Sequence, residues 1–256
     1  MVTPIQNYET YNSCMSKSLI DKLFFVDKIE PDCIVDFGCA NGLLLQELKR
    51  CYPEGVRLIG HDLDPKMIAE AKQNTGLPIF SCWAQVEKQL TDNSALILSS
   101  VIHEIYTYSK PDEIDHFWNL VFRSAPAFKY VVIRDLIPSR TIDRPADIND
   151  VVKVYRKFHG QPLLNEFQFH WGSVENNKNL IHFLLKYRYQ ANWKREVKEN
   201  YFPLYREDFL ALIPEGWSVS YHEHYPLPYT KNQVRRDLGI EIKDHTHLKI
   251  ILQRDE

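Results

Sequence analysis

The stretch at residues 34–45, IVDFGCANGLLL, constrains the fold more than any other part of the chain. Its apolar start is typical of a buried strand, and the leucines at its end begin a helical pattern. Between them stand an acid, Asp36, and three small residues, Gly38, Ala40 and Gly42. Small residues at a strand-to-helix turn let backbone N–H groups approach a ligand closely. Because the chain has only nine glycines and places two of them here, we expect a ligand at this turn.

Strand and helix patterns alternate along the first half of the chain. Short apolar runs typical of strands lie at 33–38, 56–62, 78–83, 95–101 and 129–135. Amphipathic runs typical of helices lie at 16–29, 42–52, 64–74 and 111–125. This alternation predicts an α/β fold with a doubly wound, mostly parallel sheet.

The alternation breaks after Asp135. The next run typical of a strand, 217–225, begins roughly eighty residues later, whereas a crossover between parallel strands needs far fewer. We therefore expect a single domain over residues 1–256 that carries a helical insertion at 139–200, acting as a lid or substrate-recognition segment. Apolar residues at helical spacing predict one long helix over 176–201.

Charge and cysteine content bear on partners and compartment. The net charge of −3 gives no sign of a polyanion-binding surface overall, but residues 151–200 carry nine Lys and Arg against four Asp and Glu. The five cysteines are odd in number and confined to the first third of the chain, which predicts a reducing compartment. The sequence shows no leader pattern and no run near about eighteen apolar residues, so we expect a cytoplasmic protein without a membrane anchor.

At the glycine turn the chain resembles the class I methyltransferases that use S-adenosylmethionine. Their first motif reads (D/E)-x-G-x-G-x-G, and DFGCANG at 36–42 matches it with Ala40 in place of the middle glycine. The resemblance extends to Asp62, the acid that ends the second strand run. It implies S-adenosylmethionine as the cofactor, with Asp36 at the methionine ammonium and Asp62 at the ribose hydroxyls. It also implies a seven-stranded sheet with an antiparallel final strand.

Three further residues, Leu63, Trp83 and Ser99, complete the expected cofactor set. Leu63 follows the ribose acid and Ser99 ends the fourth strand run. Trp83 lies after the third strand, where the family usually has an acid for the adenine amino group. Either Trp83 packs on the adenine or the register differs. Two other interpretations of the turn stay open, namely an NAD(P) site, which has a different glycine spacing, and a purely structural turn.

Catalysis of methyl transfer depends mainly on placing the acceptor's nucleophile in line, about 3 Å from the methyl carbon. A base is needed only where that nucleophile must lose a proton. His103 and Glu104 follow the fourth strand and Asp135 ends the fifth, at the edge of the sheet where ligands bind, so these three are the catalytic candidates. Capping or orienting roles for His103 and Glu104, and a helix cap or a salt bridge with Arg134 for Asp135, are the alternatives.

The inserted segment is the best guide to the acceptor. It interleaves rings and cations, as in KYRYQANWKR at 186–195, which suits an aromatic or anionic acceptor. The candidate acceptor-binding residues are Arg134, Tyr187, Trp193 and Lys194. An amphipathic helix whose rings pack inward and whose cations point to water explains the same pattern.

The motif (D/N)-P-P-(Y/F/W) does not follow the fourth strand, which argues against the enzymes that methylate exocyclic amines of DNA bases or glutamine amides. We expect a small anionic or aromatic metabolite or nucleotide, methylated on O or N, and no metal or membrane partner. One alternative is an RNA methyltransferase, assisted by a metal ion on paired strand histidines, and another is a non-catalytic cofactor-binding subunit. The histidines of that alternative are His222, His224, His245 and His247.

Overall fold

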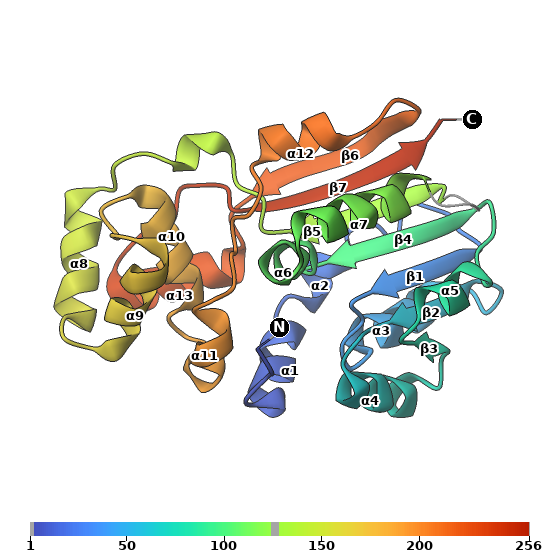
Figure 1. The fold of residues 1–256 in the computed structure, drawn as a ribbon, viewed down its shortest axis with the longest axis horizontal. Helices are drawn as coiled ribbons and strands as arrows, with labels where there is room; N and C mark the ends of the chain where they lie inside the picture. The colour runs from blue at the N-terminus through green and yellow to red at the C-terminus, as the bar shows by residue number, and fades with distance from the viewer. Residues whose placement is uncertain (1–2, 124–127, 256) are drawn as a thin grey trace. The chain divides into compact units, whose positions relative to one another are not determined.

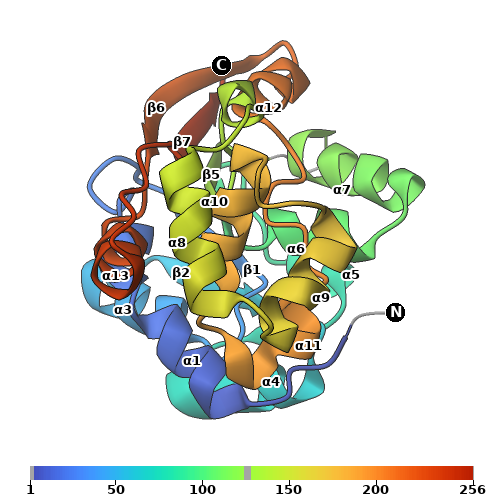
Figure 2. The ribbon, with the colours of Figure 1, turned by 90° about the vertical axis from the view of Figure 1, so that its left-hand side faces the viewer.

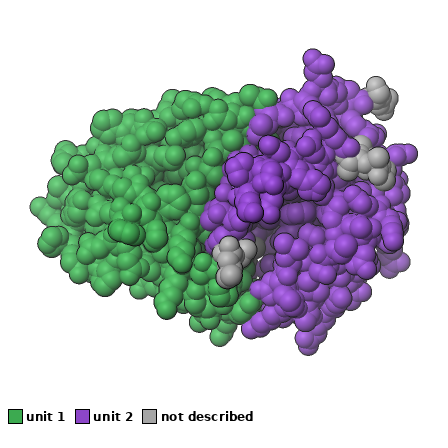
Figure 3. Space-filling model, viewed as in Figure 1, with its two compact units in different colours: residues 1–13, 136–211, 224–248 green, residues 14–135, 212–223, 249–256 purple. Residues whose placement is uncertain are grey.

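The computed structural model describes residues 3–123 and 128–255, and it divides the chain into two compact units (Figure 3). Unit 1 consists of Met1–Ser13, Leu136–Ala211 and His224–Leu248, and unit 2 of Cys14–Asp135, Leu212–Glu223 and Lys249–Glu256. The predicted insertion at 139–200 lies within unit 1. Its role as a lid stays a prediction. In the described part of the chain, no helix has the length and apolar character needed to cross a bilayer.

Unit 2 is built on a seven-stranded sheet with the order β3-β2-β1-β4-β5-β7-β6 (Figure 1). The strands are β1 (Cys33–Phe37), β2 (Arg57–His61), β3 (Ile79–Phe80), β4 (Ser94–Ser99), β5 (Tyr130–Asp135), β6 (Trp217–Tyr225) and β7 (His247–Arg254). β1 pairs in parallel with both β2 and β4, β2 with β3, and β4 with β5. The chain thus moves outward from β1 to β3, returns to β4 and moves outward in the other direction. This order confirms the predicted doubly wound fold class.

The final strand runs against its neighbour, as the resemblance implies. The side chains of Ser218 and Ser220 on β6 contact the carbonyl oxygens of Gln253 and Ile251 on β7, so residue numbers rise along one strand as they fall along the other. The arrows of β6 and β7 in Figure 1 point in opposite directions. The antiparallel final strand is therefore confirmed.

Among the helices of unit 2, α4 (Pro65–Thr75) begins and ends where sequence signals place it. The others include α2 (Leu19–Lys22), α3 (Leu43–Cys51), α5 (Trp83–Glu87), α6 (Ile102–Tyr108) and α7 (Pro111–Arg123). Asp64 caps α4 by accepting the N–H of Lys66 at 2.8 Å, Pro65 fills the first helical position, and Gly76 ends the helix at a φ of 67°. The last two residues of the helix predicted at 111–125 lie outside the described residues.

Alternation along the strands assigns Asp36 and Ser99 to one face of the sheet. That face carries a buried cluster in which strand residues pack on α3, α4 and the segment after α2. The cluster includes Ile34, Leu44, Leu45, Leu48, Ala71, Ala95, Ile97, Val132 and Phe25. Asp36 and Ser99 each stand two residues after a member of this cluster, Ile34 and Ile97, and therefore share its face. The apolar core thus ends where the two polar side chains begin.

The predicted helix over 16–29 is wrong for most of its length, because only Ser16, the last residue of α1 (Tyr8–Ser16), and Leu19–Lys22 are helical there. α2 has four residues, and the chain continues in tight turns, with the N–H of Val26 bonded to the carbonyl of Leu23 and that of Lys28 to Phe25. Such turns bury side chains at nearly the same spacing as a helix, so periodicity alone does not distinguish the two.

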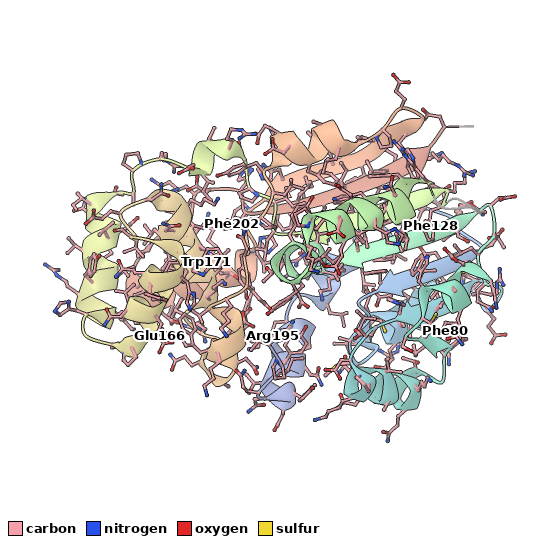
Figure 4. All side chains as sticks on the ribbon, in the orientation of Figure 1. Phe80, Phe128, Glu166, Trp171, Arg195 and Phe202 are labelled. Carbon is pink, nitrogen blue, oxygen red and sulfur yellow. The ribbon has the colours of Figure 1, made fainter. Side chains whose placement is uncertain are left out.

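Unit 1 is mainly helical (Figure 2). Its helices include α1 (Tyr8–Ser16), most of which belongs to this unit, α8 (Ile148–Phe158), α9 (Pro162–Trp171), α10 (Asn177–Lys186), α11 (Trp193–Glu196), α12 (Arg206–Leu212), whose last residue belongs to unit 2, and α13 (Pro228–Leu238). Its core is rich in aromatic rings, and Phe183 packs edge to face on Phe158 and Phe167 at centroid distances of 5.1 and 5.3 Å. Trp171 and Phe202, labelled in Figure 4, pack in the same core. The aromatics of this segment therefore serve largely as core.

The predicted single helix over 176–201 is wrong. α10 ends at Lys186, and a 3-10 turn (Gln190–Asn192) separates it from the one-turn α11. The side chain of Lys186 donates hydrogen bonds to the backbone carbonyls of Glu196 and Glu199. These bonds fold the later part of the segment back onto the end of α10, and such tertiary contacts override helical propensity.

Candidate cofactor and active site

β1 and β4 lie side by side, and the chain leaves them toward opposite edges of the sheet. In doubly wound folds, ligands bind in the crevice outside the carboxyl ends of two such strands. A pocket lies at this place within unit 2. Its lining comes from α2, the turn after β1, α3 and the end of β4, namely Leu19, Lys22, Asp36, Gly38, Cys39, Ala40, Asn41, Leu43, Leu44 and Ser99.

The turn after β1 requires its glycines on steric grounds. Gly38 and Gly42 have φ angles of 76° and 79°, and Ala40 has a φ of 47°. A Cβ at Gly38 would lie 2.8 Å from Cγ2 of Val101, and one at Gly42 would lie 2.8 Å from Cγ2 of Thr75. Packing alone therefore accounts for both glycines. The case for a ligand has to come from the polar groups of the pocket.

Asp36 and Lys22 are buried charged groups on the wall of this pocket, with exposed fractions of 3% and 4%. Burial raises the pKa of Asp36 to about 7, while Lys22 acts to lower it and Asp62 to raise it. Burial also lowers the pKa of Lys22 to about 8, an effect that Arg134 reinforces and Asp36 opposes. Both groups are held at a cost in solvation, which is typical of functional sites.

Asp62 holds the glycine turn in place from the end of β2. Its Oδ2 accepts the N–H of Ala40 at 2.8 Å, and its Oδ1 accepts the N–H of Asp64 at 2.9 Å. A carboxylate has about four acceptor positions, so it can receive further donors besides these two. The predicted contact of Asp62 with ribose hydroxyls stays a prediction.

Ser99 presents a polar atom to the pocket. Its side chain is 7% exposed, and its Oγ has no hydrogen-bond partner among the described residues. Leaving a buried polar group unsatisfied costs about 1–3 kcal/mol, and native folds rarely do so without a reason. A ligand in the pocket would supply the missing partner.

Leu63 and Trp83 do not line this pocket in the described structure. Leu63 is 75% exposed. The ring of Trp83 packs against Phe37, His61 and Phe128 at centroid distances of 5.6, 5.5 and 6.2 Å. Phe37 follows Asp36 directly and so points to the opposite face of the sheet, which places Trp83 with the aromatic cluster of that face. Phe128 is labelled in Figure 4.

Asp135, fully buried at the end of β5, joins α6 to the sheet. Its Oδ2 accepts the N–H of Ile102, the first residue of α6, at 2.7 Å. Its Oδ1 lies 2.7 Å from Nδ1 of His103, which is 7% exposed. One carboxylate thus caps the helix and orients the histidine ring, in the way that a catalytic base is usually held. Glu104 follows on α6 and is half-buried.

The guanidinium of Arg134 bonds to other side chains of unit 2. Its Nε donates to Oδ2 of Asp21 at 2.9 Å, and its Nη1 donates to Oγ of Ser100 at 2.9 Å. Asp21 also pairs with Nζ of Lys249 at 2.7 Å. Arg134 is 4% exposed, so the structure places this acceptor-binding candidate where it fastens α2 to the sheet.

The other acceptor-binding candidates lie in unit 1. Tyr187 is buried in the core, and its hydroxyl donates to Oδ2 of Asp237 at 2.8 Å. Trp193 is half-buried and donates to Oε2 of Glu166 at 2.8 Å. Lys194 is exposed and lines a groove of this unit. Trp193 and Lys194 are thus brought together on α11, whereas Tyr187 serves the core.

The four strand histidines differ in their surroundings. His224 lies with Nε2 3.1 Å from the carbonyl oxygen of Ile137 and with its ring edge to face on His245, at 5.1 Å between centroids. His247 is buried and His222 is exposed. Within residues 3–123 and 128–255, no group of three or more metal-ligating side chains includes any of them.

No protein-family model matches the chain, and no curated protein matches it either. Solved structures do match. The small RNA methyltransferase HEN1 is similar over 94% of this chain and 25% of its own length, with a TM-score of 0.50 and 16% identity. The methyltransferase domain of bacterial CtHen1-C is similar over 93% of this chain and 97% of its own length, with a TM-score of 0.49 and 14% identity. The N-methyltransferase NodS from Bradyrhizobium japonicum WM9 is similar over 96% of this chain and 98% of its own length, with a TM-score of 0.45 and 11% identity.

The chain has the class I methyltransferase fold. At 16% identity the likeness to HEN1 concerns the fold, and this chain spans a quarter of that protein's length. The fold that the resemblance implied from DFGCANG is thereby confirmed.

Within this methyltransferase fold, the sequence analysis missed several lining residues of the pocket, and the charged one among them is Lys22. Nothing in the glycine motif indicates it, since it lies fourteen positions before Asp36. A signal was present, because Lys22 falls at helical spacing between the apolar residues Leu19 and Phe25. A lysine on an apolar stripe is predicted to be either snorkelling or buried for a purpose.

Proposed function

We propose that the protein is an enzyme that transfers a methyl group from S-adenosylmethionine to an oxygen or nitrogen of its acceptor. The observation that carries this proposal is the pocket at the switch point of the sheet. Asp36 and the hydroxyl of Ser99, which has no partner among the described residues, both line it beside the glycine turn. An NAD(P) site would need a different glycine spacing, and a purely structural turn would need neither polar group.

Each part of the cofactor has a partner of fitting chemistry. The carboxylate of Asp36 suits the methionine ammonium, and the remaining acceptor capacity of Asp62 suits the ribose hydroxyls. The backbone of the turn at Gly38 and Ala40 lines the pocket and is available to the cofactor. When bound, the cofactor supplies a methyl group on an electrophilic sulfonium carbon.

His103 is the proposed base. Asp135 fixes its ring through Nδ1, so the ring exchanges protons with an acceptor through Nε2. Asp135 is itself held by the N–H of Ile102, which keeps the pair in register with the end of β4. Glu104, the next residue on α6, is the second candidate for orienting an acceptor.

The acceptor is proposed to be a small anionic or aromatic molecule. Trp193 and Lys194 on α11 offer a ring and a cation in adjacent positions, and the groove that Lys194 lines also contains Lys198 and Phe169. The side chain of Phe169 is 86% exposed, whereas the phenylalanines in the core of this unit are buried. An exposed ring beside two cations suits a planar group that carries negative charge.

An RNA acceptor is the second candidate, and the same groove favours it, because exposed rings stack bases and lysines neutralise phosphates. Binding of a short single-stranded RNA, measured at 50 and 200 mM salt, separates the two. A steep fall in affinity with salt, lost in the variant Lys194→Met/Lys198→Met, supports RNA, and absence of binding at either salt concentration removes it.

Calorimetric titration with S-adenosylmethionine, S-adenosylhomocysteine and NAD tests the cofactor. We expect micromolar binding of the first two and none of NAD. Asp36→Asn, which keeps the shape but loses the charge, should weaken S-adenosylhomocysteine binding about tenfold to a hundredfold, as removal of a buried charge-assisted hydrogen bond does. Unchanged affinity in this variant would remove the proposal's main support. Binding of the cofactor without turnover of any acceptor would favour the non-catalytic alternative.

Replacing His103 with Asn tests the base. Turnover should fall about a hundredfold to ten-thousandfold, while calorimetric affinity for S-adenosylhomocysteine stays within about twofold of wild type. The control is His116→Asn on α7, which should leave turnover unchanged. Equal loss of turnover and of cofactor affinity in His103→Asn would show that the residue supports the fold rather than the chemistry.

A further inference from the structure

The wall of the cofactor pocket carries a cation that the glycine motif does not account for. Lys22 lines the pocket together with Asp36, and both side chains are almost completely buried. Burying an ammonium group is costly, so it is rarely kept without a counter-charge or a task. The counter-charge is present, because Lys22 interacts electrostatically with Asp36, Asp135 and Asp21.

The lining of the pocket therefore includes one acid and one amine that interact electrostatically. An α-amino acid carries the complementary pair, an ammonium and a carboxylate on the same carbon. A carboxylate binds an ammonium and an amine binds a carboxylate through charge-assisted hydrogen bonds, which are about twice as strong as neutral ones. The two side chains together match a zwitterion, whereas Asp36 alone matches only a cation.

Arg134 is the other cation near this wall, but it is committed elsewhere. It bonds Asp21 and Ser100, and it does not line the pocket in the described structure. Its pairing with Asp21 also positions Lys22, because Asp21 and Lys22 are adjacent on α2. Asp21 is held at Oδ2 by Arg134 and at Oδ1 by Lys249, at 2.9 and 2.7 Å. These ion pairs fasten α2 to β5 and β7 and thereby hold Lys22 over the pocket.

We propose that Lys22 binds the carboxylate of the cofactor's methionine end while Asp36 binds its ammonium. Without cofactor, Lys22 and Asp36 neutralise each other. On binding, each exchanges this partner for the opposite charge of the incoming zwitterion, so the wall stays neutral and selects ligands that carry an amino acid. This inference rests on the proposed function, and it assigns α2 to the binding site.

The test is a thermodynamic cycle on the full chain. Calorimetry measures three ligands against wild type and Lys22→Met. The ligands are S-adenosylhomocysteine, its decarboxylated analogue, which keeps the ammonium, and 5′-methylthioadenosine, which lacks both charges. Methionine preserves the length and apolar character of the lysine stem. Lys17→Met, an exposed lysine just before α2, is the matched control, and thermal unfolding monitors folding of each variant.

We expect Lys22→Met to weaken S-adenosylhomocysteine binding about tenfold to a hundredfold, with 5′-methylthioadenosine unchanged. Removing the carboxylate from the ligand should cost wild type a similar factor and cost Lys22→Met nothing. Equal weakening of all three ligands would show that Lys22 only supports the fold, and tighter binding of S-adenosylhomocysteine would show that Lys22 merely blocks the pocket. Either result overturns the proposal.

Wild-type binding separates this inference from the proposed function. If wild type binds 5′-methylthioadenosine and S-adenosylhomocysteine equally well, the cofactor site stands and the zwitterion clamp is overturned. If wild type binds none of the three, both are overturned. Should Lys22→Met fail to fold, the comparison of S-adenosylhomocysteine with its decarboxylated analogue in wild type decides, because a clamp requires the carboxylate to contribute.

Discussion

Each unit of this protein buries a lysine, and the two lysines differ in what surrounds them. Lys22 in unit 2 and Lys186 in unit 1 are 4% and 0% exposed, and burial lowers their pKa values to about 8 and about 7. Lys186 donates to two backbone carbonyls and lies over the rings of Tyr201 and Trp171, at 4.2 and 5.4 Å from their centroids. Lys22 stands on a pocket wall among carboxylates.

The comparison distinguishes a lysine that stabilises the fold, Lys186, from one that lines a pocket, Lys22. The ammonium of Lys186 is enclosed by its own chain, and its bonds hold the end of α10 against the segment that follows it. Lys22, in contrast, is one of the residues that line the pocket beside the glycine turn. A buried charge alone therefore does not indicate function. What indicates it is a buried charge next to an opening and an opposite charge.

The largest expected effect is on stability in unit 1. Lys186→Met should lower the free energy of unfolding by about 2–4 kcal/mol, because two buried carbonyls lose their donor. Chemical denaturation of the full chain measures it. Lys194→Met, an exposed lysine of the same unit, is the control and should change stability by less than about 0.5 kcal/mol. If Lys186→Met changed the free energy of unfolding as little as Lys194→Met does, Lys186 would have no structural role to set against the binding role of Lys22.

The pH dependence of stability should reveal the pair in unit 2. The folded-state pKa of Asp36 is raised to about 7, so its contribution to stability is present below about pH 4 and is lost as the pH rises toward 7. The folded-state pKa of Lys22 is lowered to about 8, so stability is regained as the pH rises from about 8 toward 10.5. Together they produce a minimum near neutral pH.

Comparing wild type with Asp36→Asn/Lys22→Met isolates this contribution, of the order of 1–3 kcal/mol. The unfolding free energy of the double variant should vary less between pH 4 and 7 and between pH 8 and 10. The variant Asp112→Asn/Lys110→Met, at an exposed position, should keep the wild-type profile. If the double variant also keeps it, the buried pair does not titrate as described.

The smallest effect is expected for Lys22→Met alone, whose unfolding free energy at pH 7 should lie within about 1 kcal/mol of wild type. The apolar stem is retained, the lost ammonium was costly to bury, and Asp36, with its raised pKa, can take up a proton. Thermal unfolding of both proteins in the same buffer checks this. A loss as large as that of Lys186→Met would give the two lysines the same structural role.

The sequence predicted the sheet well because its signals are local. β4 is buried throughout and β1 is buried up to Asp36, as strands of a parallel sheet are. Gly38 and Gly42 occupy backbone positions that only small residues tolerate. It predicted unit 1 poorly. The helical period over 176–201 continues past Lys186, and only contacts with the following segment end the helix there.

In the candidate site, too, local sequence signals predicted some residues, whereas the position of another depends on contacts far along the chain. Asp36, Gly38, Ala40 and Ser99 could be placed together from their positions at strand ends, and the pocket contains them. Lys22 could not, because its burial depends on the ion pairs of its neighbour Asp21 with residues far along the chain. The sequence placed His103 and Asp135 at the same edge of the sheet. Their contact, however, depends on β4 and β5 being neighbours, which single motifs do not encode.

Unit 1 is assembled from three separate stretches of chain, and this limits how the protein can be divided by genetic means. Asn192 receives the N–H groups of Gln6 and Asn7 on its Oδ1 at 2.9 and 2.7 Å and donates to the carbonyl of Asn7, so the start of the chain depends on the middle. Deleting residues 139–200 would remove that anchor together with most of the core that receives Val234, Ile240 and Ile242. A graft of this unit onto a related enzyme would therefore have to transplant all three stretches at once.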